Sequence, residues 1–431
     1  MAAGHHDHRT GLEARRGGVR LTVAVLVPIA VLTLAAMIWL WPGGMDDAEP
    51  WQGPQRLSGE VTRIAEEPCP ALPEGTQGPP GTNAPAVCGK VVVRLTDGPD
   101  TGTEVVSDLP TGPGAPAIQR GDRVVVIYLA DSPAGASYQI IDHQRGTRLW
   151  VLVAAFALAV VAFGRWRGVT ALAGLGVTFA VLLLFVVPAI LQGSSPLLIA
   201  IVGAAAIMLT VLYLTHGFTV PTSMAVLGTL ASLTLTGVLS AVTTAAMKLT
   251  GVGNEESSFL TIMFSDVNMR GLLLAGILIG SLGVLDDVAV TQAYTVDELA
   301  QANPTLSFGG LYRAATRVGR AHIASVVNTI VLAYAGASLP LMILLAAGNQ
   351  PLAEVLTSEL IAQEVVRSAV GTIGLIAAVP ITTALAALTA RRTAARDHPP
   401  ARHRSRHRLD DIGAAWAHCD QDPRDRHAFP S

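Results

Sequence analysis

The chain has 431 residues, of which 51% are hydrophobic and only 14% are charged. Together with a mean hydropathy of +0.47, this composition excludes an ordinary soluble protein with one or two cores and indicates a membrane protein. The formal net charge is −3, and no strongly basic patch is interleaved with aromatic residues, so nucleic acid is not an expected partner.

The N-terminal part of the chain is predicted to cross the membrane once. Residues 1–20 are polar and rich in Arg and His, which predicts a cytoplasmic tail. Residues 21–41 are apolar, end in two tryptophans suited to a membrane interface, and are followed by no Ala-x-Ala cleavage site. We therefore expect a retained transmembrane helix, with the arginines before it on the cytoplasmic side.

Residues 42–147 are predicted to form an extracytoplasmic β-rich domain, either a small barrel or a sandwich. Its expected strands are β-branched runs separated by Gly, Pro and Asp, namely Val61–Ile64, Lys90–Leu95, Glu104–Val106, Arg123–Leu129 and Tyr138–Ile141. The domain shows no catalytic constellation, and its lone His143 is interpreted as a surface residue rather than a ligand.

Cys69 and Cys88 bracket a stretch of this domain that is rich in Pro and Gly, and they are the candidates for a disulfide. A domain outside the cytoplasm meets oxidising conditions, under which such a bond persists. The alternative is a pair of free thiols in a loop. No second close pair of Cys or His accompanies them, so a metal site is not expected.

Residues 148–390 are predicted to be a membrane domain of about seven further transmembrane helices. Its apolar runs are near or above the roughly 20 residues that cross a bilayer, and they occur near 149–164, 168–190, 196–215, 219–246, 271–291, 322–347 and 366–390. With the first span, the fold class is a mostly α-helical, polytopic bundle of about eight spans. Arginine clusters place both termini in the cytoplasm, and residues 391–431 are predicted to be a disordered tail.

Two adjacent carboxylates, Asp286 and Asp287, interrupt an apolar run that otherwise has the composition of a membrane helix. An ionised Asp in the bilayer core costs roughly 2.5–3.5 kcal/mol on insertion scales, and such residues usually face the bundle interior and serve a pathway or relay. The pair is therefore the main functional prediction. The alternative is that it caps or pins the bundle, since polar residues also join membrane helices.

Helical periodicity sorts the residues around this pair. At 100° per residue, Gly276, Gly280, Gly283 and Asp287 share one stripe, and glycines at this spacing predict close packing against a neighbouring helix. Asp286 is expected to point about 100° away, toward another neighbour or a cavity.

The next apolar run is expected to be antiparallel and to bring polar groups to the depth of the carboxylates. The candidates for a proton or ion relay with the two aspartates are His322, Asn328 and Thr329. On the outer side, the candidates for a substrate or ion entrance are Glu255, Glu256, Asn268 and Arg270. The alternative for this outer group is a solvated loop with an interfacial arginine.

Common enzyme chemistries lack their motifs in this sequence. Walker A, Gly-x-Ser-x-Gly and His-Glu-x-x-His motifs are absent. Adjacent aspartates on one helix diverge, so they do not form the close dyad of an aspartic protease. We therefore expect no enzyme activity, no catalytic residues and no cofactor.

Residues 270–299 and 319–345, which contain the Gly-Val-Leu-Asp-Asp and His-Ile-Ala-Ser motifs, resemble the YibE/F-like family of bacterial multi-pass membrane proteins, and the resemblance extends over residues 149–390. It implies a location in the bacterial cell membrane. The same motifs and residues 219–237 are more weakly similar to one half of the resistance-nodulation-division transporter core. That similarity implies proton-carrying roles for Asp286 and Asp287, because they occupy the matching positions.

The leading hypothesis from the sequence is a proton- or ion-coupled transporter, or a permease subunit, that moves an unknown small solute or ion across the lipid bilayer. A homo-oligomer is a further expectation, because one protomer with few polar spans does not enclose a pathway easily. The alternative is a membrane scaffold or sensor that does not transport and whose extracytoplasmic domain binds a partner.

Overall fold

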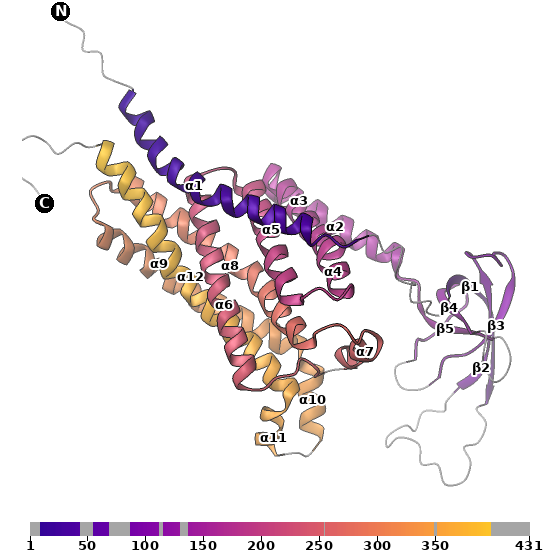
Figure 1. Cartoon of the computed structure of the whole chain (residues 1–431). Coiled ribbons are helices and arrows are strands. Elements are labelled where there is room, and N and C mark those ends of the chain that lie inside the picture. The colour runs from indigo at the N-terminus through magenta and orange to yellow at the C-terminus, as the bar shows by residue number, and fades with distance from the viewer. Residues whose placement is uncertain are drawn as a thin grey trace, which may run out of the picture. The chain divides into compact units, whose positions relative to one another are not determined.

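The computed structural model describes residues 9–43, 55–68, 87–111, 115–129, 137–253, 255–348 and 351–397. Residues 1–8 of the predicted N-terminal tail, residues 398–431 of the predicted C-terminal tail, and Cys69 lie outside the described residues. The chain divides into two compact units (Figure 1), one made of Met1–Trp41 with Gly174–Ser431 and the other of Pro42–Ala173.

Five strands of the second unit form a closed barrel (Figure 1), namely β1 (Arg56–Pro68), β2 (Val87–Leu95), β3 (Glu104–Asp108), β4 (Arg123–Leu129) and β5 (Ser137–His143). Their order around the barrel is β1-β2-β3-β5-β4. All neighbouring strands are antiparallel except β3 and β5, which are parallel. The five predicted strands are confirmed, the domain is a barrel rather than a sandwich, and its strand order is that of an OB-fold.

The barrel core follows from alternation along the strands. Val91 and Val93 on β2, and Val124 and Val126 on β4, are separated by one residue each, so they point to the same face and are fully buried. Gly89 has φ +157°, and a Cβ there would collide with a carbonyl oxygen of β1. Glycine is therefore required where β2 passes close to β1.

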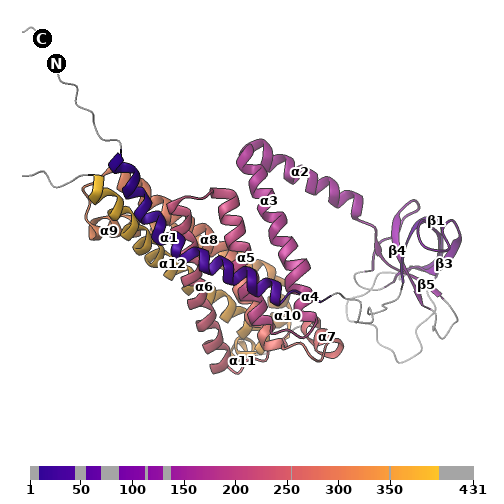
Figure 2. The same ribbon diagram turned by 45° about the horizontal axis from the view of Figure 1, so that its top comes forward.

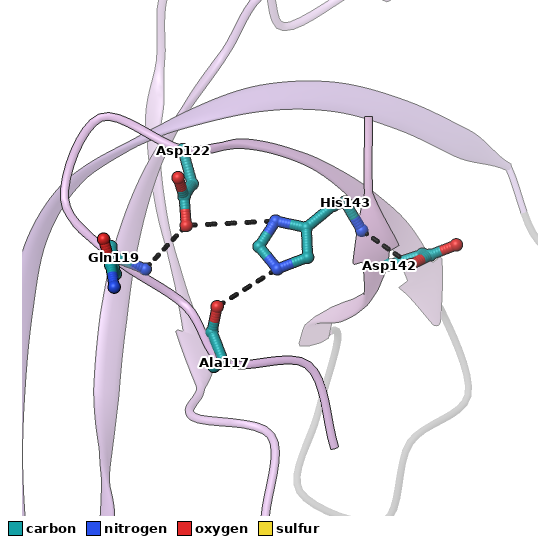
Figure 3. A network of polar contacts seen from close by, with 5 residues as sticks. All are labelled: Ala117, Gln119, Asp122, Asp142 and His143. Carbon is teal, nitrogen blue, oxygen red and sulfur yellow. Dashed lines mark hydrogen bonds and ion pairs between the residues drawn. The ribbon is translucent and has the colours of Figure 1, made fainter. Parts of the chain in front are cut away.

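His143, at the end of β5, fastens the loop that precedes β4 (Figure 3). Its Nε2 lies 3.1 Å from the carbonyl oxygen of Ala117, and its Nδ1 lies 3.9 Å from Oδ2 of Asp122. The same oxygen of Asp122 accepts the backbone N–H of Gln119 at 2.7 Å. His143 is half-buried and lies between two acceptors, so its role here is to hold this loop in place.

The remaining described elements are helical. The longer ones are α1 (Arg9–Trp39), α2 (Gly146–Gly164), α3 (Trp166–Val181), α5 (Pro196–His216), α6 (Val220–Ala246), α8 (Met269–Ala302), α9 (Phe308–Ala337) and α12 (Glu359–Asp397). A π-helix, η2 (Leu182–Val186), joins α3 to α4 (Val187–Leu191), and the short helices are α7 (Glu255–Met263), α10 (Leu339–Ala347) and α11 (Leu352–Thr357). The helices α1 and α12 extend into the predicted tails, as far as Arg9 and Asp397.

Seven helices within the described residues are long and apolar enough to cross a membrane, and they correspond to the seven predicted spans of the membrane domain. The helix of the predicted first span, α1, has a shorter apolar stretch, Val23–Trp39. Figure 2 shows α1 running along the bundle of α5, α6 and α12. The expected polytopic α-helical fold with a small β-barrel is confirmed.

The helical unit is built around a three-way contact of α6, α8 and α12. A Cβ on Gly228 of α6 would collide with the hydroxyl of Thr382 on α12, and one on Gly374 of α12 would collide with the hydroxyl of Thr236 on α6. A hydroxyl packed on a glycine therefore sets the spacing of α6 and α12 at two levels. Small residues allow this close approach of backbones in a membrane.

Candidate functional site

The two aspartates lie in the middle of α8. This helix has 34 residues, which corresponds to a length of about 51 Å. Asp286 is half-buried and Asp287 is exposed, whereas Leu285 and Val288 on either side are buried. Oδ1 of Asp286 accepts the backbone N–H of Asp287 at 2.8 Å. No other hydrogen bond or ion pair of either carboxylate is found among the described residues.

Contacts in the C-terminal part of α8 define the depth of the pair. Tyr294 lies at the level where α6 begins, because its Oη is 3.3 Å from Oγ1 of Thr219 and 3.2 Å from Oγ1 of Thr222. Asp286 precedes Tyr294 by eight residues, or about 12 Å along the axis. Its position is therefore well inside the bundle and toward the end at which α6 starts.

Asp286 belongs to a row of α8 that faces away from α9. Leu272 and Ile279 precede it by two and one heptads, a spacing that keeps the row on one side of the helix. Both pack against a cluster that contains Phe185 of η2 and Ile199 of α5. The side chain of Asp286 is thus on the side of α8 that α5 and η2 cover.

The helix α9 contacts the opposite side of α8. Nε2 of Gln292 donates to the carbonyl oxygen of Ala315 at 2.9 Å, and a Cβ on Gly280 would lie 3.4 Å from Oη of Tyr334. Gln292 and Gly280 are each six residues from Asp286, which places them about 120° from it on either side. Along the axis of α8, one contact lies on each side of Asp286. Residues 322–329 of α9 lie between the two contacting residues of that helix, Ala315 and Tyr334, so they are at about the depth of Asp286.

The predicted relay residues on α9 lie at the depth of Asp286, but they are not on the side of α8 to which Asp286 points. His322 is half-buried, and its Nε2 has no hydrogen-bond partner in the described part of the chain. Asn328 and Thr329 are exposed. Asn328 follows the buried Gly319 by nine residues, which is half a turn out of phase, so it points away from the bundle. Within one chain, neither it nor His322 reaches Asp286.

Of the predicted glycine stripe, Gly280 lies beside a neighbouring helix, because a Cβ there would lie 3.4 Å from Oη of Tyr334 on α9, whereas the other two glycines do not. Gly276, Gly280 and Gly283 are exposed, and a Cβ on Gly276 or Gly283 would meet no atom within 4 Å. The glycines that do receive neighbouring helices include Gly228, Gly319 and Gly374. Periodicity identifies residues that share a face of a helix, but it does not tell which face the rest of the bundle covers.

Gln292 is a buried polar residue that sequence reasoning missed. It is 3% exposed, and its Nε2 donates to the carbonyl oxygen of Ala315 on α9 and to Oγ1 of Thr383 on α12, the latter at 2.8 Å. One amide therefore joins three helices. The available signal was an uncharged amide six residues after Asp286, directly after the same apolar run.

Sequence reasoning also missed a line of buried hydroxyls along α6. Its members recur at spacings of three, four or seven residues and are fully buried, namely Thr222, Thr229, Ser232, Thr236, Ser240 and Thr244. Thr236 and Ser240 donate to carbonyl oxygens four residues earlier, at 2.8 and 2.7 Å. Thr229 and Ser232 have no partner among the described residues. The line faces the seam between α8 and α12 and makes the bundle centre polar.

The residues of the predicted outer entrance occupy two separate elements. Glu255 and Glu256 are exposed in the first turn of α7. Asn268 caps α8, because its side chain accepts the backbone N–H of Gly271 at 2.8 Å, and Arg270 is exposed in the first turn of that helix. Asn268 therefore has a structural role.

A carboxylate that the sequence did not single out closes the bundle at this end. Oε1 of Glu359, at the start of α12, accepts the backbone N–H groups of Thr250 and Gly251 at 2.6 and 3.2 Å. Nε2 of Gln363 donates to the same oxygen at 3.1 Å. Glu359 thus holds the loop that follows α6.

Two other sequence predictions concern cysteine and metal chemistry. Cys88 is disulfide-bonded, and Cys69, its predicted partner, lies outside the described residues. Within the described ranges, no three His, Cys, Asp or Glu side chains gather as a metal site.

Comparison with known proteins gives one match. A family model described as YibE/F-like protein matches residues 152–392, which is more than half of the chain. No curated protein and no solved structure matches the chain significantly.

Proposed function

Because the chain belongs to the YibE/F-like family and is a multi-pass helical membrane protein, we propose that it is a proton- or ion-coupled transporter, or the permease subunit of one. Asp286 and Asp287 are the coupling groups in this proposal. The single observation that carries it is a half-buried carboxylate in the middle of a membrane-length helix, without a cationic partner within 4.0 Å among the described residues.

The physical argument starts from the cost of this arrangement. A carboxylate in the bilayer core is expensive as an ion, so in such a place it is kept by pairing, by protonation or by binding a cation. Asp286 has the backbone N–H of Asp287 as a partner, which offsets only part of that cost. Reversible binding of a proton or small cation is the function that this group suits.

The surroundings of Asp286 suggest where the movement takes place. Its row on α8 packs against η2, and π-helical turns recur at functional sites because they hold one residue more than an α-helical turn. In the proposal, a shift of η2 and α5 against α8 opens and closes access to Asp286. Asp287, exposed and one residue further, exchanges the ion with the opposite face of α8.

The groups on α9 have a supporting part in the proposal. His322, Asn328 and Thr329 lie at the depth of the pair but on a helix that contacts the other side of α8. Asp287 is seven residues from Gly280 and therefore lies on the edge of α8 that meets α9. Exchange with α9 is accordingly assigned to Asp287 rather than to Asp286.

The test is proton and sodium flux into vesicles that contain the purified full chain and a pH- or sodium-sensitive dye. Asp286→Asn is expected to reduce the flux to background, because an amide carries neither a proton nor a counter-charge. Glu298→Gln is the matched control, since it makes the same change at an exposed position of α8. Its flux is expected to equal that of the wild type.

Equal flux in Asp286→Asn and the wild type, for both ions and in both directions, contradicts the proposal. If that variant also has a lower melting temperature than Glu298→Gln, the pair is a structural pin. The scaffold or sensor alternative would then be the better account.

A further inference from the structure

The helix α8 has a surface unlike that of the other helices that are long and apolar enough to cross a membrane. Each of the other six exposes three or more large hydrophobic side chains, such as Leu183, Val238 and Ile376, which suits contact with lipid chains. Over the described residues, α8 exposes none. The surface of α8 therefore does not have the composition of one that faces lipid.

What α8 exposes instead is a stripe of small and polar residues, which we call the open stripe. Its members recur at spacings of three or four residues and lie within about 80° of one another, namely Gly276, Gly280, Gly283, Asp287 and Thr291. A Cβ on Gly283 would meet no atom within 4 Å, so the backbone there is open to a neighbour. Small residues allow a helix to approach closely in a membrane, whereas a carboxylate that faces lipid is costly.

The neighbouring helix α9 exposes a stripe with the same spacing. Its members are Ala321, Ser325, Asn328 and Leu332, all of which are exposed. Asn328 is about 180° from Gly319, and Asp287 is about 140° from Gln292, so both point away from the buried contact of Gly319 with Gln292. The helix α9 also borders the open stripe at Gly280. The two stripes therefore continue one surface of the helical unit.

Contacts within one chain fix the relative depth of the two stripes. Gly280 lies at the level of Tyr334, and the helices are antiparallel, so Gly283 lies at about the level of Leu332. By the same count, Asp287 lies within about one turn of Asn328. A two-fold axis along the membrane normal preserves depth, so these levels also match between two copies of the chain.

The two stripes are complementary at these levels. Leu332 is 62% exposed and lies at the depth of a glycine that leaves space for it. The amide of Asn328 is a donor at the depth of the carboxylate of Asp287, and neither side chain has a hydrogen bond among the described residues. A second copy of the chain thus offers a leucine to the glycine and an amide to the carboxylate.

We propose that the open stripe binds α9 of a second copy of this chain, in a two-fold symmetric dimer. Leu332 of one copy packs on Gly283 of the other, about 10 Å along α8 from Gly276, and the amide of Asn328 donates to Asp287. Each copy contributes both stripes, so the contact is isologous. A dimer in which the two open stripes face each other would instead bring the two Asp287 carboxylates together, where they repel.

This inference does not depend on coupled transport, because it rests on the composition of one surface. The experiment counts copies of the full chain, carrying a fluorescent tag at the C-terminus, in lipid vesicles by the number of photobleaching steps. A series of protein-to-lipid ratios gives the dissociation constant of the dimer. The wild type is expected to show two steps and to change to one step only at high dilution.

Two exposed glycines provide the matched variants. Gly283→Leu fills the place that Leu332 of the other copy takes and is expected to raise the dissociation constant about tenfold or more. Gly176→Leu is the control, since Gly176 is exposed on α3 and a Cβ there also meets no atom within 4 Å. Its dissociation constant is expected to equal that of the wild type.

Exchange of the two polar groups tests which helices meet. Asn328→Asp puts a carboxylate opposite Asp287 and is expected to weaken the dimer about tenfold. The double variant Asp287→Asn with Asn328→Asp again places one amide opposite one carboxylate. Its dissociation constant is expected to return to within about threefold of the wild type.

One photobleaching step at every protein-to-lipid ratio overturns the dimer. Equal dissociation constants of Gly283→Leu and Gly176→Leu overturn the proposed surface. A double variant that associates no better than Asn328→Asp, or unchanged association in Asn328→Asp, overturns the pairing of α8 with α9 of the other copy. Proton and sodium flux are not measured in this experiment, so its outcome is separate from that of the transport test.

Discussion

At the scale of single residues, Asp142 in the barrel has a pKa below its usual value. The cause is a hydrogen bond of 2.6 Å from Arg145, to which the backbone N–H of His143 adds another of 2.8 Å. A lowered carboxyl pKa means that folding favours the ionised form. Its contribution to stability is therefore present above the unfolded pKa, near about 4, and is lost as the pH falls through the folded pKa.

Arg145→Gln is accordingly expected to destabilise the end of β5 at pH 7 and to have little effect at about pH 2, where Asp142 is protonated in both chains. Hydrogen exchange of the β5 amides at the two pH values measures this. An effect of the substitution that is as large at the low pH as at pH 7 contradicts the assignment.

The second prediction at this scale concerns Gln292, whose amide joins three helices. Gln292→Leu keeps the volume and removes both interhelical hydrogen bonds, so the full chain is expected to lose about 1 kcal/mol of stability. Thermal unfolding in detergent compares it with Thr295→Val. Among the described residues, the hydroxyl of Thr295 bonds within α8, to the carbonyl oxygen of Thr291 at 2.7 Å. A melting temperature of Gln292→Leu equal to that of the control shows that the amide is not needed.

At the scale of helices, two glycines allow a matched prediction. A Cβ on Gly374 collides with the hydroxyl of Thr236, whereas a Cβ on Gly276 meets nothing within 4 Å. Gly374→Ala is expected to push α12 from α6 and to cost about 1–3 kcal/mol. Gly276→Ala is expected to be neutral or to stabilise the helix by up to about 1 kcal/mol.

Thermal unfolding of the two alanine variants checks both values. Loss of stability in Gly276→Ala, with none in Gly374→Ala, would mean that the exposed stripe rather than the seam of α6 and α12 carries the helix packing.

At the scale of the whole molecule, the buried clusters of the two units are separate, because the cluster inside the barrel shares no residue with the clusters among the helices. Val93→Asp puts a carboxylate into the barrel core, where its burial costs more than the barrel can offset. The barrel is expected to unfold while the helices stay protected.

Hydrogen exchange resolved by peptide measures this, with Val106→Asp as the control because Val106 is 54% exposed on β3. Loss of protection in α8 together with β2 would show that the units do not fold separately.

The sequence by itself determined the elements. Apolar runs of membrane length are visible because a helix in lipid must be apolar over its span, and all seven spans of the membrane domain were predictable on that ground. The five strands were predictable from their β-branched residues and from the Gly, Pro and Asp residues between them. Asp286 and Asp287 stood out because a charge is rare in such a run.

Tertiary structure decided which faces meet. In a sequence, a glycine that packs against a neighbouring helix cannot be told from one that does not. Gly276 and Gly283, which no helix of the same chain covers, were therefore indistinguishable in advance from Gly228 and Gly374, which neighbouring helices cover. Asp286 and α9 lie on opposite sides of α8 because of the way in which α5, α6, α9 and α12 pack around that helix, and this arrangement results from contacts between residues distant in the chain. Periodicity is a property of one helix, whereas burial is a property of several.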